Sequence, residues 1–365
     1  MKFILLKAYL IIGFSIYAGA AQDQRIADSL LVVSQQDEFI NYPDSVKFSV
    51  YISISRYSAK PEEVLTFGKH AKLLADKIGR PEWIAQSDLC IGDAYRLKGD
   101  LVKATEYYIK CANIGLLINQ KKITASAYNN MGTVYRAQNN KSQAIFYLKK
   151  SIEIYRDTEE TLHLSSILLN LGEVYRVNGV LDSAYLYFQE SIELVKTIDA
   201  ELVYAYCLGN IGLVYAEQGK VPEAEKNINE AIRLLEKFGD YYPIAVYKME
   251  LADIFKSKGE LSRAQELLMN SYNMSKEQGL KEQIRDVGLK LSKYFEEVKD
   301  YEKAYFYQNE YMTYRDSINN KQSIMKIADL RTEFEVSKKQ IEVDLLNEEA
   351  QKQRIFLISL AVILA

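Results

Sequence analysis

The sequence predicts an all-α, right-handed solenoid of 40-residue helix pairs, because three kinds of residue recur in one register over five copies. Small residues recur at Gly92, Gly132, Gly172, Gly212 and Ala252. Aromatic residues follow three positions later, at Tyr95, Tyr135, Tyr175, Tyr215 and Phe255. Alanines follow twelve positions after the small residues, at Ala104, Ala144, Ala184, Ala224 and Ala264. Periods of roughly 20–50 residues are typical of solenoids and other repeat arrays.

Each copy is predicted to contain two helices joined by a tight turn. Apolar residues have helical spacing in the first half of the copy that contains Gly172. Gly179 suits the end of that helix, where left-handed backbone is needed. Asp182 is expected to cap the second helix, as Asp100 does in its own copy. We expect Gly172 to face the small side chain of Ala184 or Ser191, so that the two helices approach closely.

These residues resemble the tetratricopeptide repeat (TPR) motif, in which small, aromatic, glycine and alanine residues stand at fixed offsets. The matching positions in one copy are Leu171, Gly172, Tyr175, Gly179, Ala184, Phe188 and Ser191. The usual TPR period is about 34 residues. The longer step in this chain implies that each helix is nearly a turn longer than in the common repeat.

The first 50 residues precede the clear repeats. Residues 1–21 are predicted to be a signal peptide, with Lys2 and Lys7 before a mostly apolar run and the small residues Ala18-Gly19-Ala20 at its end. The alternative is a retained membrane anchor, but Lys7 interrupts the apolar run. Residues 22–50 are expected to form an N-terminal helix that caps the array.

The solenoid is predicted to span residues 51–314 as about seven helix pairs, of which the first and last are atypical. Terminal repeats are expected to differ, because one of their faces lacks a neighbour. No stretch rich in proline, glycine or serine interrupts the copies. The array should therefore be one continuous superhelix.

Residues 315–354 are predicted to form a helical coiled-coil stalk. Apolar residues step by three and four along it, at Ile327, Leu330, Phe334 and Ile341. Such a seam is typical of paired helices, so we expect these residues to join two protomers in a homodimer. The alternative is a single helix that packs back on the last repeat.

The last eleven residues, 355–365, are uncharged and almost wholly apolar. This length is about half of a membrane span. We expect it to begin a transmembrane helix that continues beyond Ala365. The alternative is an apolar helical tail that docks on the protein. Together with the signal peptide, it predicts a protein of the inner membrane with its repeats in the periplasm.

The residues present predict no enzyme, no cofactor and no nucleic-acid binding. Charges of both signs are interspersed, with a net charge of −3. His70 and His163 have no metal-ligand cluster around them and are expected at helix surfaces or interfaces. Cys90 and Cys111 could form a disulfide within one repeat, but Cys111 occupies a small-residue position, and Cys207 would be left over.

The order of these parts resembles bacterial membrane-anchored TPR sensors. That group has a signal peptide, a periplasmic array, a helical stalk, one membrane span and a cytoplasmic histidine kinase or LuxR- or AraC-type DNA-binding domain. The resemblance implies a periplasmic sensor arm of a signal transducer that binds a peptide or protein. The alternative is a membrane-anchored TPR scaffold for envelope protein assembly, without an output.

A ligand is expected in the concave groove lined by the first helix of each repeat. Three asparagines stand two residues before the repeat glycine: Asn130, Asn170 and Asn210. Three arginines stand four residues after it: Arg96, Arg136 and Arg176. Asparagine can both donate to and accept from a peptide backbone, and arginine could meet a carboxylate. For the asparagines the alternative is hydrogen bonding between neighbouring helices. For the arginines, about 120° further round the helix, the alternatives are a place at the rim of the groove or bonds between repeats.

Overall fold

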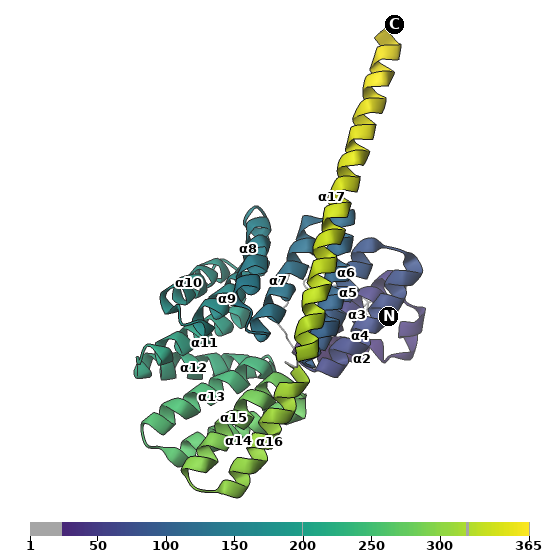
Figure 1. Ribbon diagram of the computed structural model, residues 1–365. Helices are drawn as coiled ribbons and strands as arrows, with labels where there is room; N and C mark the ends of the chain where they lie inside the picture. The colour runs from purple at the N-terminus through teal and green to yellow at the C-terminus, as the bar shows by residue number, and fades with distance from the viewer. Residues whose placement is uncertain (1–23, 199, 319–320, 365) are drawn as a thin grey trace.

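The computed structural model describes residues 24–198, 200–318 and 321–364, and within them every regular element is a helix (Figure 1). The array begins with α2 (Gln24–Ser34) and the short 3-10 helix η1 (Asp37–Asn41). Seven helix pairs follow: α3 (Asp44–Tyr57) with α4 (Pro61–Ile78), α5 (Pro81–Leu97) with α6 (Leu101–Leu117), α7 (Lys121–Ala137) with α8 (Lys141–Arg156), α9 (Thr161–Val177) with α10 (Leu181–Val195), α11 (Glu201–Glu217) with α12 (Val221–Glu236), α13 (Tyr241–Ser257) with α14 (Leu261–Gln278), and α15 (Lys281–Glu297) with α16 (Tyr301–Ile318). A single long helix, α17 (Lys321–Leu364), ends the described chain.

The predicted all-α, TPR-like solenoid is confirmed for the described part of the chain. The first helices of successive repeats contact one another from α3 to α15. No comparable contact joins the second helices that the structure describes. The first helices therefore line the inner face of the superhelix, and the second helices lie outside.

The repeat glycines have a different partner from the one expected. A Cβ atom at Gly172 would lie 2.5 Å from Cε1 of Phe188, so the glycine makes room for an aromatic ring rather than for Ala184. Equivalent close approaches are Gly92 to Tyr108, Gly132 to Leu148 and Gly212 to Ile228. Ser191 has a separate function, because its hydroxyl donates to the carbonyl of Ser165 at 2.9 Å. The expected pairing with small side chains was wrong because the large side chain points at the glycine.

The turns follow the sequence prediction in part. Gly179 has a φ of 74°, as a left-handed helix end requires. Asp100 accepts a hydrogen bond from the backbone N–H of Lys103 at 3.1 Å and caps α6. Asp182 was wrongly expected to cap α10, since it lies in the first turn of that helix.

The contact between Gly172 and Phe188 leads to a stability prediction. Gly172→Ala should lower the free energy of unfolding by about 1–3 kcal/mol, because the new methyl group overlaps the ring. Thermal unfolding followed by circular dichroism measures this. In a protein that already carries Phe188→Leu, Gly172→Ala should cost less stability than it does in the wild type. Equal costs in the two backgrounds would contradict the contact.

The solenoid stops after α16 because that helix lacks the small residue that earlier second helices bury. The small residues are Cys111, Ser151, Ser191, Ala231 and Ser271. All five are at most 1% exposed. The position 40 residues after Ser271 holds Tyr311, whose ring would occupy the space of a following first helix. This gives a steric reason why the next helix does not extend the array.

Helix α17 instead crosses to the middle of the array and packs along α6 (Figure 1). Ile327 and Phe334 are both 1% exposed and belong to the hydrophobic core of α5–α9. The rings of Phe334 and Tyr128 meet edge to face at 6.4 Å between centroids. Tyr147 donates from its hydroxyl to Glu335 Oε1 at 3.1 Å. The alternative of a helix packed back on the array therefore describes α17, although its site is α6–α8 and not the last repeat.

The stalk residues predicted to join two protomers thus have partners within their own chain. Ile327, Phe334 and Ile341 are buried, and Leu330 is half-buried. These four residues form one stripe, as the three-and-four spacing indicated. In the described arrangement the stripe faces the solenoid and is not available to a second protomer.

The predicted inner-membrane localisation, with the repeats in the periplasm, is contradicted. Over the residues that the structure describes, no helix has both the length and the hydropathy needed to cross a bilayer. The expected start of a transmembrane helix at residues 355–365 is therefore not supported. The predicted signal peptide at residues 1–21 lies outside the described residues.

The superhelix closes on itself where its beginning meets α12 and α13. The backbone N–H of Gln24 donates to the carbonyl of Phe238 at 3.0 Å. The guanidinium of Arg25 lies 4.4 Å from the centre of the Phe238 ring. Tyr242 packs against the buried cluster of Val64 in α4 with Ala94 and Leu97 in α5. Helices α2 and α5 are thereby fixed against segments more than 140 residues further along the chain.

Asp240, beside this closure, makes stability depend on pH. Its side chain is fully buried, and burial raises its pKa to about 7, although hydrogen bonds from the Tyr206 hydroxyl and the Tyr242 backbone N–H lower it. The ordinary value is 3.8. Between about pH 4 and pH 7 the folded protein holds a proton that the unfolded chain releases, so stability falls as pH rises through this window.

Asp240→Asn should flatten this pH dependence, because the amide does not titrate. The wild type should lose up to about 4 kcal/mol of unfolding free energy between pH 4 and pH 8 through this group. Urea unfolding at both pH values measures the loss. Asp182→Asn, on an exposed side chain, is the control. An equal loss in Asp240→Asn and wild type would contradict the assignment.

Candidate ligand-binding site

The three asparagines of the predicted groove lie on first helices, and each has a partner in the protein. Asn130 donates to Asp93 Oδ1 of α5 at 2.8 Å. Asn170 of α9 donates to Asn129 Oδ1 at 2.8 Å. Asn129 in turn donates to Asn130 at 2.9 Å, so one chain of hydrogen bonds joins α5, α7 and α9. The asparagines connect repeats in this structure, as the alternative reading supposed, and their role in binding stays a prediction.

Asn210 has a different kind of hydrogen-bond partner from Asn130, so the two asparagines can be compared within one chain. Its Oδ1 accepts from the hydroxyl of Tyr247 at 3.1 Å, but this hydroxyl also lies 3.2 Å from the carbonyl of Tyr206. Tyr247 therefore keeps an acceptor if Asn210 is removed. Asp93 keeps only its bond from Tyr108, at 2.8 Å, if Asn130 is removed.

Asn130→Ala should therefore destabilise the protein by about 1–3 kcal/mol, because a largely enclosed carboxylate loses a donor. Asn210→Ala should cost less than about 1 kcal/mol. Differential scanning calorimetry of the two variants measures the difference. An equal loss of stability in Asn210→Ala and Asn130→Ala would show that the hydrogen bond to Asp93 does not stabilise the protein more than the bond to Tyr247 does.

Arg176 links repeats and has little capacity left for a ligand. Its guanidinium donates twice to Glu173, at 2.8 Å each, and once to Glu217 of α11. Burial opposes ionisation of Glu173, but the charge and hydrogen bonds of Arg176 and the charge of Arg136 hold its pKa below the usual value. Arg176 thus bonds neighbouring repeats together, which is one of the alternatives given for the arginines in the sequence analysis.

Arg96 and Arg136 lie closer to the closure and meet residues from the far end of the array. Burial alone would lower the pKa of Arg136, but Tyr242, Glu173 and Glu282 raise it above its ordinary value. Burial likewise opposes the charge of Arg96, and its pKa is raised by Tyr108 and Asp93 and then by Tyr242 and Glu282. Tyr242 of α13 and Glu282 of α15 therefore lie beside α5 and α7 across the inner face.

We call this group the closure cluster and define it as Arg96, Arg136, Tyr242, Glu282 and Gln283. Tyr242 is at its centre, with its hydroxyl donating to Glu282 Oε2 at 2.8 Å. Gln283 bonds to the same hydroxyl and lowers the pKa of Tyr242, although burial raises that pKa overall. Four first helices, α5, α7, α13 and α15, contribute to the cluster.

Two polar atoms of the closure cluster are buried without a protein partner. They are Nε of Arg136, a donor, and Oε1 of Gln283, an acceptor. The Gln283 side chain is almost inaccessible, whereas Arg136 keeps 24% of its side-chain surface exposed. Buried polar atoms are nearly always paired with protein, water or ligand. The cluster therefore has hydrogen-bonding capacity that the protein itself does not use.

Sequence reasoning found Arg96 and Arg136 but missed the rest of the cluster. Tyr242, Glu282 and Gln283 lie outside the repeat motif, at the starts of α13 and α15. They reach Arg136 only because the superhelix closes. No local pattern indicates a contact over more than 100 residues.

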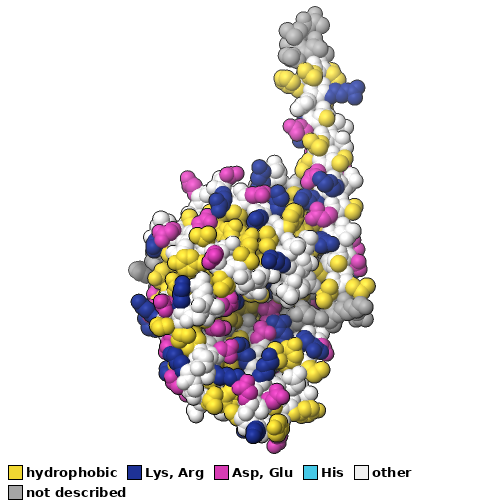
Figure 2. Space-filling view, turned by 60° about the vertical axis from the view of Figure 1, so that its left-hand side comes forward, with side chains coloured by type: hydrophobic (Ala, Val, Ile, Leu, Met, Phe, Trp, Pro, Cys, Tyr) yellow, Lys and Arg dark blue, Asp and Glu magenta, His cyan; other side chains and the backbone are white. Residues whose placement is uncertain are grey.

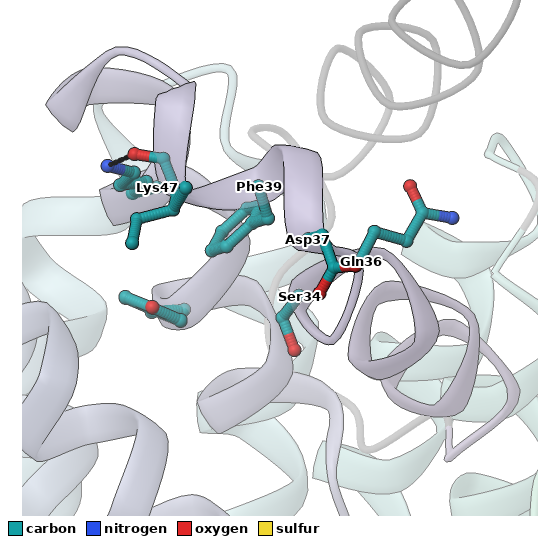
Figure 3. A pocket seen from close by; sticks show the side chains of 7 residues that line it. Ser34, Gln36, Asp37, Phe39 and Lys47 are labelled. Atoms are coloured by element: carbon teal, nitrogen blue, oxygen red, sulfur yellow. Dashed lines mark hydrogen bonds between the residues drawn. The ribbon is translucent and has the colours of Figure 1, made fainter.

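A second candidate site, at the N-terminal end, is less suited to specific binding. A cavity there is lined by Ser34, Asp37 and Lys47 around the ring of Phe39 (Figure 3). The Lys47 ammonium already donates to the carbonyl of Ile40. The opening is therefore lined by groups that have partners or face solvent.

The other residues singled out by the sequence carry no site in the described part of the chain. Cys90, Cys111 and Cys207 are all buried and free, so the possible disulfide does not form. His163 stacks on Tyr155 with ring centres 5.2 Å apart, at an interface between repeats. No group of three or more histidine, cysteine or acidic side chains among the described residues could hold a metal ion. That the chain is not an enzyme stays a prediction.

Comparison with known proteins supports the repeat assignment. The family model of the MalT-like TPR region matches residues 116–287. Among solved structures, a Rap protein complexed with competence and sporulation factor aligns over 84% of this chain and 81% of its own, with a TM-score of 0.63 and 14% identity. NprR in complex with its cognate peptide NprX aligns over 89% of this chain and 92% of its own, with a TM-score of 0.58 and 18% identity.

At these identities the likeness is one of fold. The comparison with curated proteins found no match. The chain therefore carries TPR-like repeats and shares the all-helical superhelical fold of these two structures. The finer resemblance to a periplasmic sensor of a membrane transducer is not shown.

Proposed function

We propose that this chain is a regulatory protein that binds a peptide, or a peptide segment of a partner protein, at the closure cluster on the inner face of its superhelix. The observation that carries the proposal is the pair of buried, unpartnered atoms, Arg136 Nε and Gln283 Oε1. The solved complexes of a Rap protein and of NprR support it by analogy of fold.

A peptide backbone matches this pair chemically. A main-chain amide has one acceptor, the carbonyl, and one donor, the N–H. Arg136 Nε can donate to the carbonyl, and Gln283 Oε1 can accept from the N–H. A neutral amide also suits the charges around it, because Glu282 and Glu173 offset Arg96 and Arg136.

Helix α7 offers a route from binding to the rest of the molecule. It carries Asn130 and Arg136 toward the inner face, and Tyr128 and Tyr135 toward α17. Asn130 is about 160° around the helix from Tyr128 and about 140° from Tyr135, and these two tyrosines share one stripe. A ligand that shifts α7 would thereby change the packing surface of Phe334 on α7. Helix α17 is therefore the element that responds when the closure cluster binds a ligand.

The test uses a synthetic mixture of random linear heptapeptides incubated with the full chain. Bound peptides are separated by gel filtration and identified by mass spectrometry. The double variant Arg136→Met with Gln283→Met should retain at least about tenfold less of any enriched peptide, since two hydrogen bonds of about 1 kcal/mol each are lost. Thermal melting checks that the variant remains folded.

Arg233→Met is the matched control, because Arg233 lies on α12, is largely exposed and bonds only to Glu230 in its own helix. It should retain peptides as wild type does. Equal retention by wild type, control and double variant would reject the closure cluster as the site. Enrichment of no peptide by wild type would reject peptide binding by the chain.

A further inference from the structure

Helix α17 carries a second apolar stripe that its own array does not cover. We call it the outer stripe and define it as Val336, Val343, Leu346, Ala350 and Leu357. All five side chains are exposed, including Val336 at 66%, Leu346 at 65% and Leu357 at 62%. Hydrophobic side chains lie along the part of α17 that stands clear of the array (Figure 2).

The outer stripe lies nearly opposite the side of α17 that is docked on the solenoid. Val336 and Val343 each follow a docked residue, Phe334 or Ile341, by two positions. Two residues turn an α-helix by about 200°, which places the stripes about 160° apart. A partner on the outer stripe would therefore meet no obstacle from the array against which α17 packs.

The spacing of the outer stripe is that of a paired helix. Val336, Val343, Ala350 and Leu357 are seven residues apart, and Leu346 falls at the second core position of its heptad, whereas Lys339 and Gln353 hold that position in the heptads on either side. A shallow depression on this side is lined by residues of α17 alone, with Val336 and Val343 among them. A single helix projecting into water gains no burial for its apolar face, and most helical stability in proteins comes from such packing.

The charges beside the stripe favour a second copy of the same helix in parallel. In a parallel pair of helices, the residue just before the first core position of a heptad lies next to a residue of the partner chain. That partner residue has a sequence number five higher. On α17 this brings Glu349 opposite Arg354 of a second chain, and the twofold axis repeats the attraction. An antiparallel pair would lose this match.

We propose that two copies of this chain form a parallel homodimer through their outer stripes, while each α17 stays docked on its own array through Phe334 and Ile341. The dimer seam is thus displaced to the opposite side of the helix from the one predicted by the sequence. This interface does not depend on the proposed peptide binding, and the variants below leave the closure cluster unchanged.

Cysteine crosslinking of the full chain separates the two stripes. Val343→Cys should give a crosslinked dimer on a non-reducing gel at least tenfold more efficiently than the control Ile341→Cys, which faces the array. The native cysteines are buried and should contribute little. Equal or stronger crosslinking of Ile341→Cys would overturn the proposal in favour of the original seam. Monomeric mass by light scattering, without crosslinking of either variant, would also overturn it.

Charge reversal tests the register. Glu349→Arg and Arg354→Glu should each shift the protein toward monomer, and the double variant should restore the dimer. Val343→Glu with Leu346→Glu should abolish the dimer without changing the melting temperature of the array, because both side chains are exposed and belong to no hydrophobic core of the described chain. A double charge reversal that stays monomeric would reject the parallel pairing.

Discussion

The rest of the structure depends on the close approach of two helices at each repeat glycine. At Gly172 a Cβ atom would lie 2.5 Å from the ring of Phe188, and equivalent close approaches recur along the array. Because each contact fixes the angle within one helix pair, a constant step between contacts produces a regular superhelix. The regular step then brings the first helices to one inner face and determines where the chain meets itself.

Closure of the superhelix is what converts a repeat array into a candidate site. Arg136 on α7 has an Nε atom without a protein partner, and Gln283 at the start of α15 has an Oε1 atom without one. Gln24 bonds to Phe238 in the turn between α12 and α13, and this closure brings Arg136 and Gln283 together at the hydroxyl of Tyr242. Both atoms are buried without a protein partner, and an unpaired buried donor or acceptor is costly, which favours a ligand that supplies both partners.

Helix α17 shows that an apolar stripe can be recognised in the sequence, while the surface that covers it cannot be identified there. The stripe of Ile327, Phe334 and Ile341 is amphipathic and requires an apolar surface. Tyr311 makes the end of the array unsuitable, and Tyr128 and Tyr147 offer a surface on α7 and α8 instead. The heptad spacing indicates an apolar face that must be covered, but the same spacing fits a second protomer or the chain's own solenoid.

The sequence by itself determined the helix pairs and their 40-residue step. These follow from local rules, since helical periodicity, turn residues and the need for glycine at a close contact act within one repeat. Only the tertiary structure decided the rest. The partners of the asparagines, the docking of α17 and the meeting of Arg136 with Tyr242 and Gln283 depend on small rotations that accumulate over several repeats. No short stretch of sequence encodes their sum, so contacts across the closed superhelix become visible only when the whole array is folded.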